Sequence, residues 1–170
     1  MKNIVLIGMP GSGKSTTGVV LAKVLGCKFI DCDLVIQEKT DKKLFELIAE
    51  YGCDGFLQIE DKINSEIIAR KSVIATGGSA VFGENAMKNF SENGIIVYLR
   101  LSLDEIKNRV GDLNRRGVVM RNATNLEECY NERIPLYEKY SDITIDCNDT
   151  SIRETVEKII MEIDKYDRKK

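Results

Sequence analysis

Residues 8–15 constrain the fold more than any other part of the chain. Their sequence, GMPGSGKS, matches the phosphate-binding loop pattern G-x-x-x-x-G-K-[ST]. A short apolar run (Asn3–Ile7) typical of a buried strand precedes the loop, and a helical pattern (Lys14–Leu25) follows it. Glycines let the backbone curl so that successive N–H groups face phosphate oxygens, and the helix adds the positive end of its dipole. The segment therefore predicts a nucleotide-binding site at the end of a strand.

Two side chains of this loop carry specific chemistry. The pattern predicts that Lys14 contacts the β- and γ-phosphates of ATP and that the Ser15 hydroxyl is a ligand of Mg²⁺. The plainer alternative is a chance glycine-rich turn, and a random match in a chain of this length is expected on the order of 1 in 100. The residues expected to bind the nucleotide here are Gly11, Ser12, Gly13, Lys14, Ser15 and Thr16.

Apolar runs of strand length alternate with helical patterns along all 170 residues. We predict strands at 3–7, 28–30, 72–76, 95–99 and 143–146. We predict helices at 14–25, 34–39, 44–51, 55–70, 84–92, 103–110, 125–140 (interrupted before Pro135) and 151–166. This alternation is typical of a parallel sheet covered by helices on both faces. With no internal repeat or linker, we expect a single α/β domain spanning residues 1–170.

Composition excludes several classes of function. A formal net charge of −2 gives no electrostatic case for nucleic acid or an anionic membrane, and no apolar run approaches the ~18 residues of a membrane span. Histidine is absent, which removes Ser-His-Asp hydrolysis and His-ligated zinc. The five cysteines form no C-x-x-C pair and suit a reducing compartment. Without a signal-peptide pattern or a heptad pattern, we expect a cytoplasmic monomer.

Polar and glycine residues follow several predicted strands, at the sheet edge where such folds bind ligands. Asp31 and Asp33 follow the second strand, residues 77–79 the third, and residues 148–150 the fifth. Each feature alone has a plainer explanation. The aspartates suit a solvated turn, the diglycine suits a tight turn, and residues 132–137 suit a helix end enforced by proline.

Taken together and in order, these motifs resemble the shikimate kinase family. They are the phosphate loop, D-x-D (Asp31, Asp33), Gly-Phe…Glu (Gly55, Phe56, Glu60), the diglycine (Gly77, Gly78), an arginine-rich lid (about 111–124) and R-x-P-L-Y (133–137). The last two distinguish the family from nucleoside monophosphate kinases and gluconate kinases of the same fold. The resemblance implies a three-layer sandwich with a five-stranded parallel sheet of order 2-3-1-4-5, and transfer of phosphate from ATP to a hydroxyl of shikimate.

The resemblance also implies roles for residues on the acceptor side. Asp31 matches the carboxylate that holds Mg²⁺ through water beside Ser15, and Asp33 matches the one that binds the acceptor hydroxyl and takes its proton. Gly77 and Gly78 match the backbone that closes on the substrate ring. Arg133 matches an arginine that pairs with the shikimate carboxylate.

Three further positions are implied on the nucleotide side. Arg109 matches a residue that lies against adenine, and Asn148 begins the segment that matches the adenine loop. Arg116 matches the lid arginine that reaches the transferred phosphate, which makes it, with Lys14 and Asp33, an expected catalytic residue. The alternative for residues 111–124 is a solvated loop that does not close.

Departures from the family pattern fall on the acceptor side. Leu57 stands where the family has a second carboxylate-binding arginine, Ser79 replaces a third glycine, and the lid reads Arg-Gly-Val-Val at 116–119. Losing one such arginine weakens binding by about 1.5–3 kcal/mol unless Arg115 or Arg121 compensates. Two alternatives therefore stay open: a kinase of another small hydroxylated acid, polyol or amino acid, and a nucleotide-binding regulatory protein with little catalysis.

Overall fold

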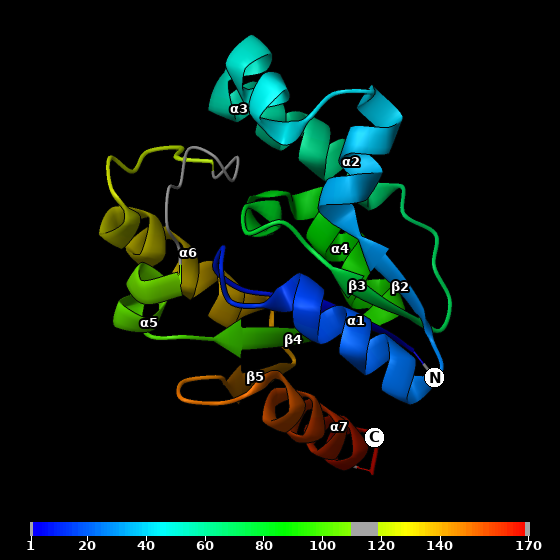
Figure 1. The fold of residues 1–170 in the computed structure, drawn as a ribbon. Coiled ribbons are helices and arrows are strands. Elements are labelled where there is room, and N and C mark those ends of the chain that lie inside the picture. Colours follow the sequence, from blue (N-terminus) through cyan, green and yellow to red (C-terminus); the bar gives the residue numbers. More distant parts are fainter. Residues whose placement is uncertain (1, 110–118, 169–170) are drawn as a thin grey trace.

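The computed structural model of this chain describes residues 2–109 and 119–168 (Figure 1). Its centre is a parallel sheet of five strands in the order β2-β3-β1-β4-β5, which confirms the predicted order. The strands are β1 (Asn3–Ile7), β2 (Lys28–Asp31), β3 (Ser72–Ala75), β4 (Gly94–Arg100) and β5 (Ile143–Asp146). Every residue of β1 is buried, because this strand pairs with β3 on one side and β4 on the other. The phosphate loop therefore leaves the middle of the sheet.

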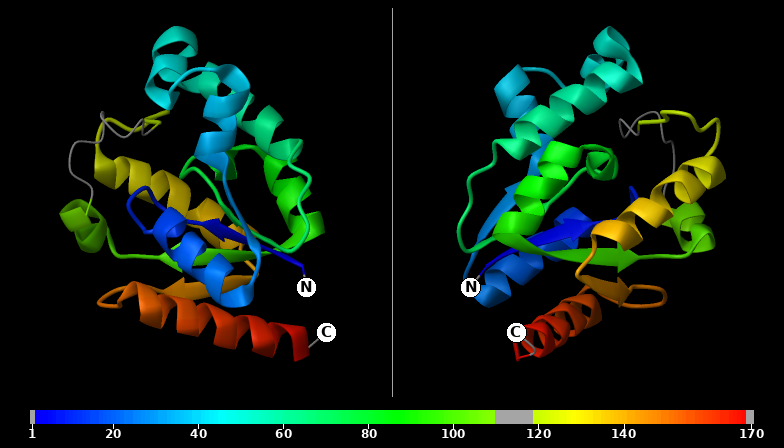
Figure 2. Two further views of the ribbon diagram at one scale, coloured as in Figure 1. Left: turned by 45° about the vertical axis from the view of Figure 1, so that its right-hand side comes forward. Right: turned by 180° about the vertical axis from the view of Figure 1, so that it is seen from behind.

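Helices cover both faces of the sheet. They are α1 (Lys14–Leu25), α2 (Cys32–Thr40), α3 (Leu44–Ser65), α4 (Glu84–Asn93), α5 (Leu103–Arg109), α6 (Leu126–Tyr140) and α7 (Ile152–Arg168), with a 3₁₀ turn at Ala80–Phe82. Figure 2 shows α1 and α7 on one face and α4 and α6 on the other. Within the described part of the chain, no helix combines the length and apolar character that crossing a membrane requires.

Two predicted helices differ in the structure. The helices predicted at 44–51 and 55–70 form one element, α3, which bends at Gly52 (φ 70°, ψ 178°) and ends at Ser65. The prediction that this helix reaches residue 70 is wrong. Ile67 and Ile68 continued the apolar pattern, yet Ile68 is 96% exposed in the connection that leads into β3. The apolar residues at positions 67 and 68 therefore do not indicate a buried helix face.

The predicted interruption before Pro135 is also wrong. Helix α6 runs unbroken from Leu126 to Tyr140 with Pro135 inside it. Proline has no N–H to donate, so the helix loses one backbone hydrogen bond at this point. Cys129, Arg133 and Tyr137 repeat every four residues and are all buried. Packing of this face on both sides of the proline offsets the lost bond and holds the helix together.

Candidate active site

The phosphate loop has the backbone conformation that its glycines permit. Gly8 has φ 147°, and a Cβ there would lie 2.7 Å from the Leu99 carbonyl oxygen. Gly13 has φ 86° and is the residue that caps the start of α1. Residues that carry a side chain rarely adopt such φ angles, so glycine is required at both positions. The loop consequently turns its backbone toward the N-terminus of α1, where anions bind favourably.

Lys14 lies at the centre of this loop. Its Nζ donates to the carbonyl oxygens of Gly8 and Met9, each at 2.9 Å. Burial lowers the pKa of Lys14 to about 8, opposed by the negative charge of Asp33. An ammonium group has three donors, so one N–H remains for a phosphate oxygen while two hold the side chain in place.

Two oxygen-bearing side chains meet beside the loop. The Ser15 hydroxyl donates to Asp31 Oδ2 at 2.7 Å, and Asp31 Oδ1 accepts from the backbone N–H of Asp33 at 3.0 Å. The second contact makes Asp31 the N-cap of α2, so its carboxylate is fixed by the helix start. A hydroxyl and a carboxylate oxygen are the hard ligands that Mg²⁺ prefers, so this pair fits the expected metal.

A cavity of about 360 Å³ adjoins the loop. Nine of the predicted site residues line it: Gly11, Gly13, Lys14, Ser15, Thr16, Asp33, Gly77, Gly78 and Arg133. They come from the loop after β1, the start of α2, the segment after β3, and α6. Ser12 does not line the cavity and is buried in the loop. The structure therefore brings phosphate-side and acceptor-side residues into one chamber.

Arg133 supplies the positive charge on the acceptor side. Its side chain is almost fully buried, donates from Nη2 to the Val119 carbonyl, and lies 5.6 Å from the Phe82 ring centre. Its Nε has no hydrogen-bond partner among the described residues. A buried guanidinium with a free donor is suited to pair with a carboxylate in the cavity.

Asp33 faces the same cavity. Burial raises the pKa of this carboxyl, Asp31 raises it further, and Lys14 opposes both. A carboxylate with a raised pKa accepts a proton more readily, which is the property required of a group that takes the proton of a hydroxyl.

Glu60 belongs to the Gly-Phe…Glu motif, but no role at the site was predicted for it. It is buried on α3, and its Oε2 accepts a hydrogen bond from the Ser79 hydroxyl at 2.6 Å. A Cβ on Gly77 would lie 2.5 Å from Glu60 Oε1 and 2.9 Å from Asp33 Oδ1, so both carboxyls flank this glycine. Ser79 thus makes a contact that a glycine there could not make. Its place in that motif, one helical turn after Phe56, was the signal available in the sequence.

Burial of Glu60 predicts a pH-dependent stability. Burial raises the pKa of Glu60 to about 7, from an ordinary value of 4.5, although the Ser79 hydrogen bond opposes the rise. Between these pH values the folded state keeps a proton that the unfolded state has released, so stability falls as pH rises. Glu60→Gln cannot ionise and escapes this loss. We expect its free energy of unfolding, relative to wild type, to rise by about 3 kcal/mol between about pH 4 and pH 8.

Urea denaturation at the two pH values measures this difference. Glu38→Gln, which removes an exposed carboxyl from α2, is the matched control and is expected to show no such change. A difference between Glu60→Gln and wild type that stays constant with pH would contradict the raised pKa of the buried carboxyl.

Leu57 lies outside the main cavity. It lines a neighbouring pocket of about 320 Å³ together with Phe82 and Arg121. Arg121 pairs with Asp54 at 3.3 Å and lies 5.6 Å from the Phe82 ring centre. Arg121 and Leu57 therefore line the same pocket, which places Arg121 close to the position of the missing arginine. Arg115 lies outside the described residues.

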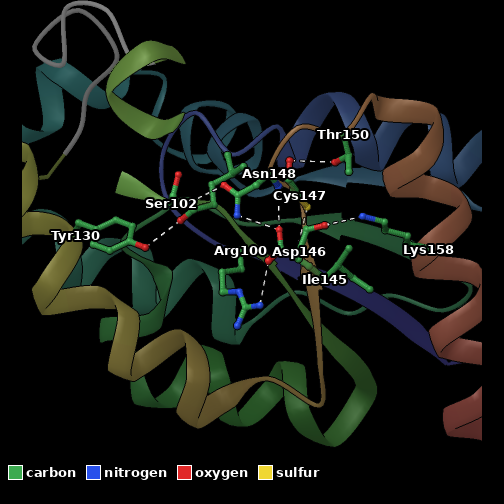
Figure 3. A network of polar contacts seen from close by, with 10 residues as sticks. Arg100, Ser102, Tyr130, Ile145, Asp146, Cys147, Asn148, Thr150 and Lys158 are labelled. Atoms are coloured by element: carbon green, nitrogen blue, oxygen red, sulfur yellow. Dashed lines mark hydrogen bonds and ion pairs between the residues drawn. The ribbon is translucent and has the colours of Figure 1, made fainter. Parts of the chain in front are cut away.

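Asn148 joins two loops at the carboxyl ends of β4 and β5 (Figure 3). Its Oδ1 accepts from the Ser102 N–H at 2.9 Å, and its Nδ2 donates to Asp146 Oδ1 at 2.9 Å. Asp146 also pairs with Arg100 at 3.1 Å. The Asn148 side chain is thus engaged in shaping the loop.

The other predicted nucleotide-side residues have different outcomes. Arg109 ends α5 and pairs with Glu105 at 3.1 Å. Arg116 lies outside the described residues. The predicted lid, residues 111–124, is described only from Val119, which lines the main cavity.

Comparison with known proteins agrees with this geometry. The sequence model of the shikimate kinase family matches residues 10–164. A shikimate kinase of Thermodesulfovibrio yellowstonii is 38% identical, over 97% of this chain and 96% of that protein. The structure of the Acinetobacter baumannii shikimate kinase in complex with shikimate has a TM-score of 0.85 at 30% identity, covering 96% and 93% of the two chains. That of the Aquifex aeolicus enzyme has 0.80 at 26%, covering 95% and 96%.

Proposed function

The chain belongs to the shikimate kinase family, and we propose that it transfers the γ-phosphate of ATP to a hydroxyl of shikimate. The observation that carries the proposal is the composition of the main cavity. It is lined at once by the phosphate loop with Lys14, by the carboxylate of Asp33 and by the buried guanidinium of Arg133. These three groups are suited to bind a polyphosphate, a hydroxyl and a carboxylate, respectively. ATP supplies the first of these, and shikimate supplies the other two.

On the nucleotide side, residues 11–16 bind the phosphates through backbone N–H groups, and the remaining N–H of Lys14 neutralises charge on the transferred phosphate. Arg116 adds a second positive charge from the lid, residues 111–124, which closes over ATP and excludes water. Arg109 and the loop that Asn148 shapes receive the adenine.

Ser15 and Asp31 would hold Mg²⁺, Asp31 through water. When bound, the ion would supply positive charge that offsets the negative charge of the ATP phosphates. The hydrogen bond between the two side chains already brings their oxygens together, so little rearrangement is needed to present both to a cation.

On the acceptor side, Arg133 pairs with the shikimate carboxylate and so fixes one end of the molecule. Asp33 accepts a hydrogen bond from the reacting hydroxyl, orients its oxygen toward the phosphate, and takes its proton. The backbone of Gly77 and Gly78 closes on the ring. Fixing both ends of the acceptor contributes to the rate because phosphoryl transfer depends on alignment.

Residues 1–170 are proposed to form one kinase domain that works as a monomer in the cytoplasm on small-molecule substrates, without nucleic acid or membrane partners. The main cluster of buried residues draws on β1, β3, β4 and β5, and the half-buried Phe29 and Ile30 of β2 pack against it, which supports the single domain. The net charge of −2 supports the absence of polyanionic partners.

Steady-state release of ADP from Mg·ATP, with and without shikimate at saturating ATP, tests the activity. A shikimate-dependent rate is expected. A rate equal to the blank, with ATP binding intact, would reject shikimate as the acceptor. Leu57 and Ser79 would then favour another small hydroxylated acid, to be sought with a panel of sugar acids, polyols and hydroxy amino acids. Loss of ATP binding itself would reject the kinase assignment.

The pocket beside Leu57 gives a prediction for substrate affinity. Leu57→Arg adds a cation next to Phe82, whose ring also lies near Arg133. A charged hydrogen bond contributes about 1.5–3 kcal/mol, so we expect the KM for shikimate to fall by about tenfold or more. Gln58→Arg adds the same charge at a more exposed position of the same pocket, so it is the control and should lower KM less than Leu57→Arg does. Equal KM values for Leu57→Arg and wild type would favour a differently shaped acceptor site.

A further inference from the structure

Tyr137 makes a contact that the proposed mechanism does not use. Its hydroxyl donates to the carbonyl oxygen of Gly78 at 2.6 Å, across 59 residues of sequence. The side chain is completely buried, lies 3.9 Å from Met9 Sδ of the phosphate loop, and stacks on Tyr98 with ring centres 5.1 Å apart. One hydroxyl therefore joins α6 to the segment after β3, beside the phosphate loop.

This contact fixes the orientation of a peptide group at the cavity. In a trans peptide the C=O and N–H point in opposite directions, so holding the Gly78 carbonyl also sets the N–H of Ser79. The preceding peptide is set in the same way, because the Gly77 carbonyl accepts from the Ala80 N–H at 3.3 Å. Among the described residues, the N–H groups of Gly78 and Ser79 have no hydrogen-bond partner, and both residues line the cavity. Two oriented donors are thus left for a ligand.

Such a segment needs an external restraint. Two consecutive glycines have wide conformational freedom, and a peptide between small residues rotates easily. A side chain at position 78 cannot supply stiffness, because its Cβ would lie 2.7 Å from Pro10 Cδ and 3.0 Å from Arg133 Nη1. The glycine is therefore needed for close approach, and its backbone has to be held from outside.

We propose that Tyr137 is a positioning residue for the acceptor, whose hydroxyl holds the Gly78 carbonyl and so keeps the N–H groups of Gly78 and Ser79 directed at the bound substrate. This inference rests on the proposed function. Tyr137 follows Arg133 by one helical turn on the same buried face of α6. The helix that delivers the carboxylate-binding arginine thereby also holds the backbone donors, and the two sets of contacts are fixed relative to each other.

Tyr137→Phe removes only the hydroxyl, and Tyr98→Phe is its matched control. Tyr98 belongs to the same stacked pair, but its hydroxyl is buried with no hydrogen-bond partner among the described residues. A hydrogen bond of this kind contributes about 1 kcal/mol, so Tyr137→Phe is expected to raise the KM for shikimate by about five- to tenfold. The Kd for ATP should stay unchanged in both variants, and Tyr98→Phe should keep the wild-type KM for shikimate.

Equal shikimate KM values for the two variants would overturn the inference, since the hydroxyl would then serve packing alone. A rise in the Kd for ATP equal to the rise in KM would also overturn it, because a general distortion of the site would explain both. Amide NMR spectra separate these results from a failure of the proposed function. If wild type shows no shikimate-dependent ADP release, the proposed activity is rejected. The positioning role is then decided by the amide resonances of Gly78 and Ser79. A shift in Tyr137→Phe but not in Tyr98→Phe supports this role, and no shift in Tyr137→Phe overturns it.

A second measurement applies if Tyr137→Phe fails to fold. Shikimate added to the wild-type protein is expected to shift the amide resonances of Gly78 and Ser79. Amides that respond support the inference, and amides that stay unchanged while other cavity residues respond overturn it.

Discussion

Lys14→Ala is expected to lower the kcat for shikimate-dependent ADP release by a factor of about 10²–10³, the usual effect of removing one group that stabilises charge in a transition state. Lys14 is the buried cation of the phosphate loop, and its burial in a less polar environment strengthens its interaction with phosphate oxygens. Steady-state kinetics at saturating ATP and shikimate measures the effect. Turnover within tenfold of wild type would contradict the role assigned to this side chain.

The hydrogen bonds of Lys14 require a second variant. Because Nζ also holds the carbonyls of Gly8 and Met9, its removal disturbs the loop as well as the charge. Lys14→Met keeps the length of the side chain and its packing but has no ammonium group. A loss of kcat shared by both variants is assigned to the missing ammonium group, whose charge and hydrogen bonds both variants lack. A loss confined to Lys14→Ala would instead show that the side chain acts through its length and packing.

The order of elements could be predicted because local patterns determine them. The limits of β1, α1 and β5 agree with prediction at both ends, since turns and buried runs bound them clearly. Errors arose where tertiary packing overrides a local rule. Pro135 lies inside α6 because buried residues on both sides hold the helix, and Ile68 is exposed although it continued an apolar pattern.

The sequence was enough to predict which residues form the candidate site, but not which side chains contact each other there. Motifs located Lys14, Asp33 and Arg133, which share the cavity. The contacts of Glu60 with Ser79 and of Tyr137 with Gly78 span 19 and 59 residues, and no local pattern specifies which hydroxyl meets which acceptor. From the sequence, Ser79 could be recognised only as a departure from the glycine of the family pattern. In the structure its hydroxyl donates a hydrogen bond to the buried carboxyl of Glu60.

The two aspartates of the D-x-D motif have different surroundings, which separates their expected roles. Asp31 bonds to Ser15 and caps α2, while Asp33 lines the cavity opposite Lys14. Asp31→Asn is therefore the control for the variant that tests Asp33. It should shift the Mg²⁺ concentration that gives half-maximal rate, because a ligand of the proposed metal site is weakened.

Asp33→Asn is expected to lower kcat by a factor of about 10²–10⁴, the range for losing a group that accepts a proton in the transition state. The amide keeps the shape of the carboxyl but cannot take the proton of the acceptor hydroxyl. Equilibrium binding should give a Kd for ATP close to that of wild type, and the Mg²⁺ dependence should also be unchanged. If Asp33→Asn instead weakens ATP binding and keeps kcat within tenfold, Asp33 belongs to the nucleotide side, and the acceptor hydroxyl must be oriented by another group, with buried Glu60 the nearest carboxyl in the cavity.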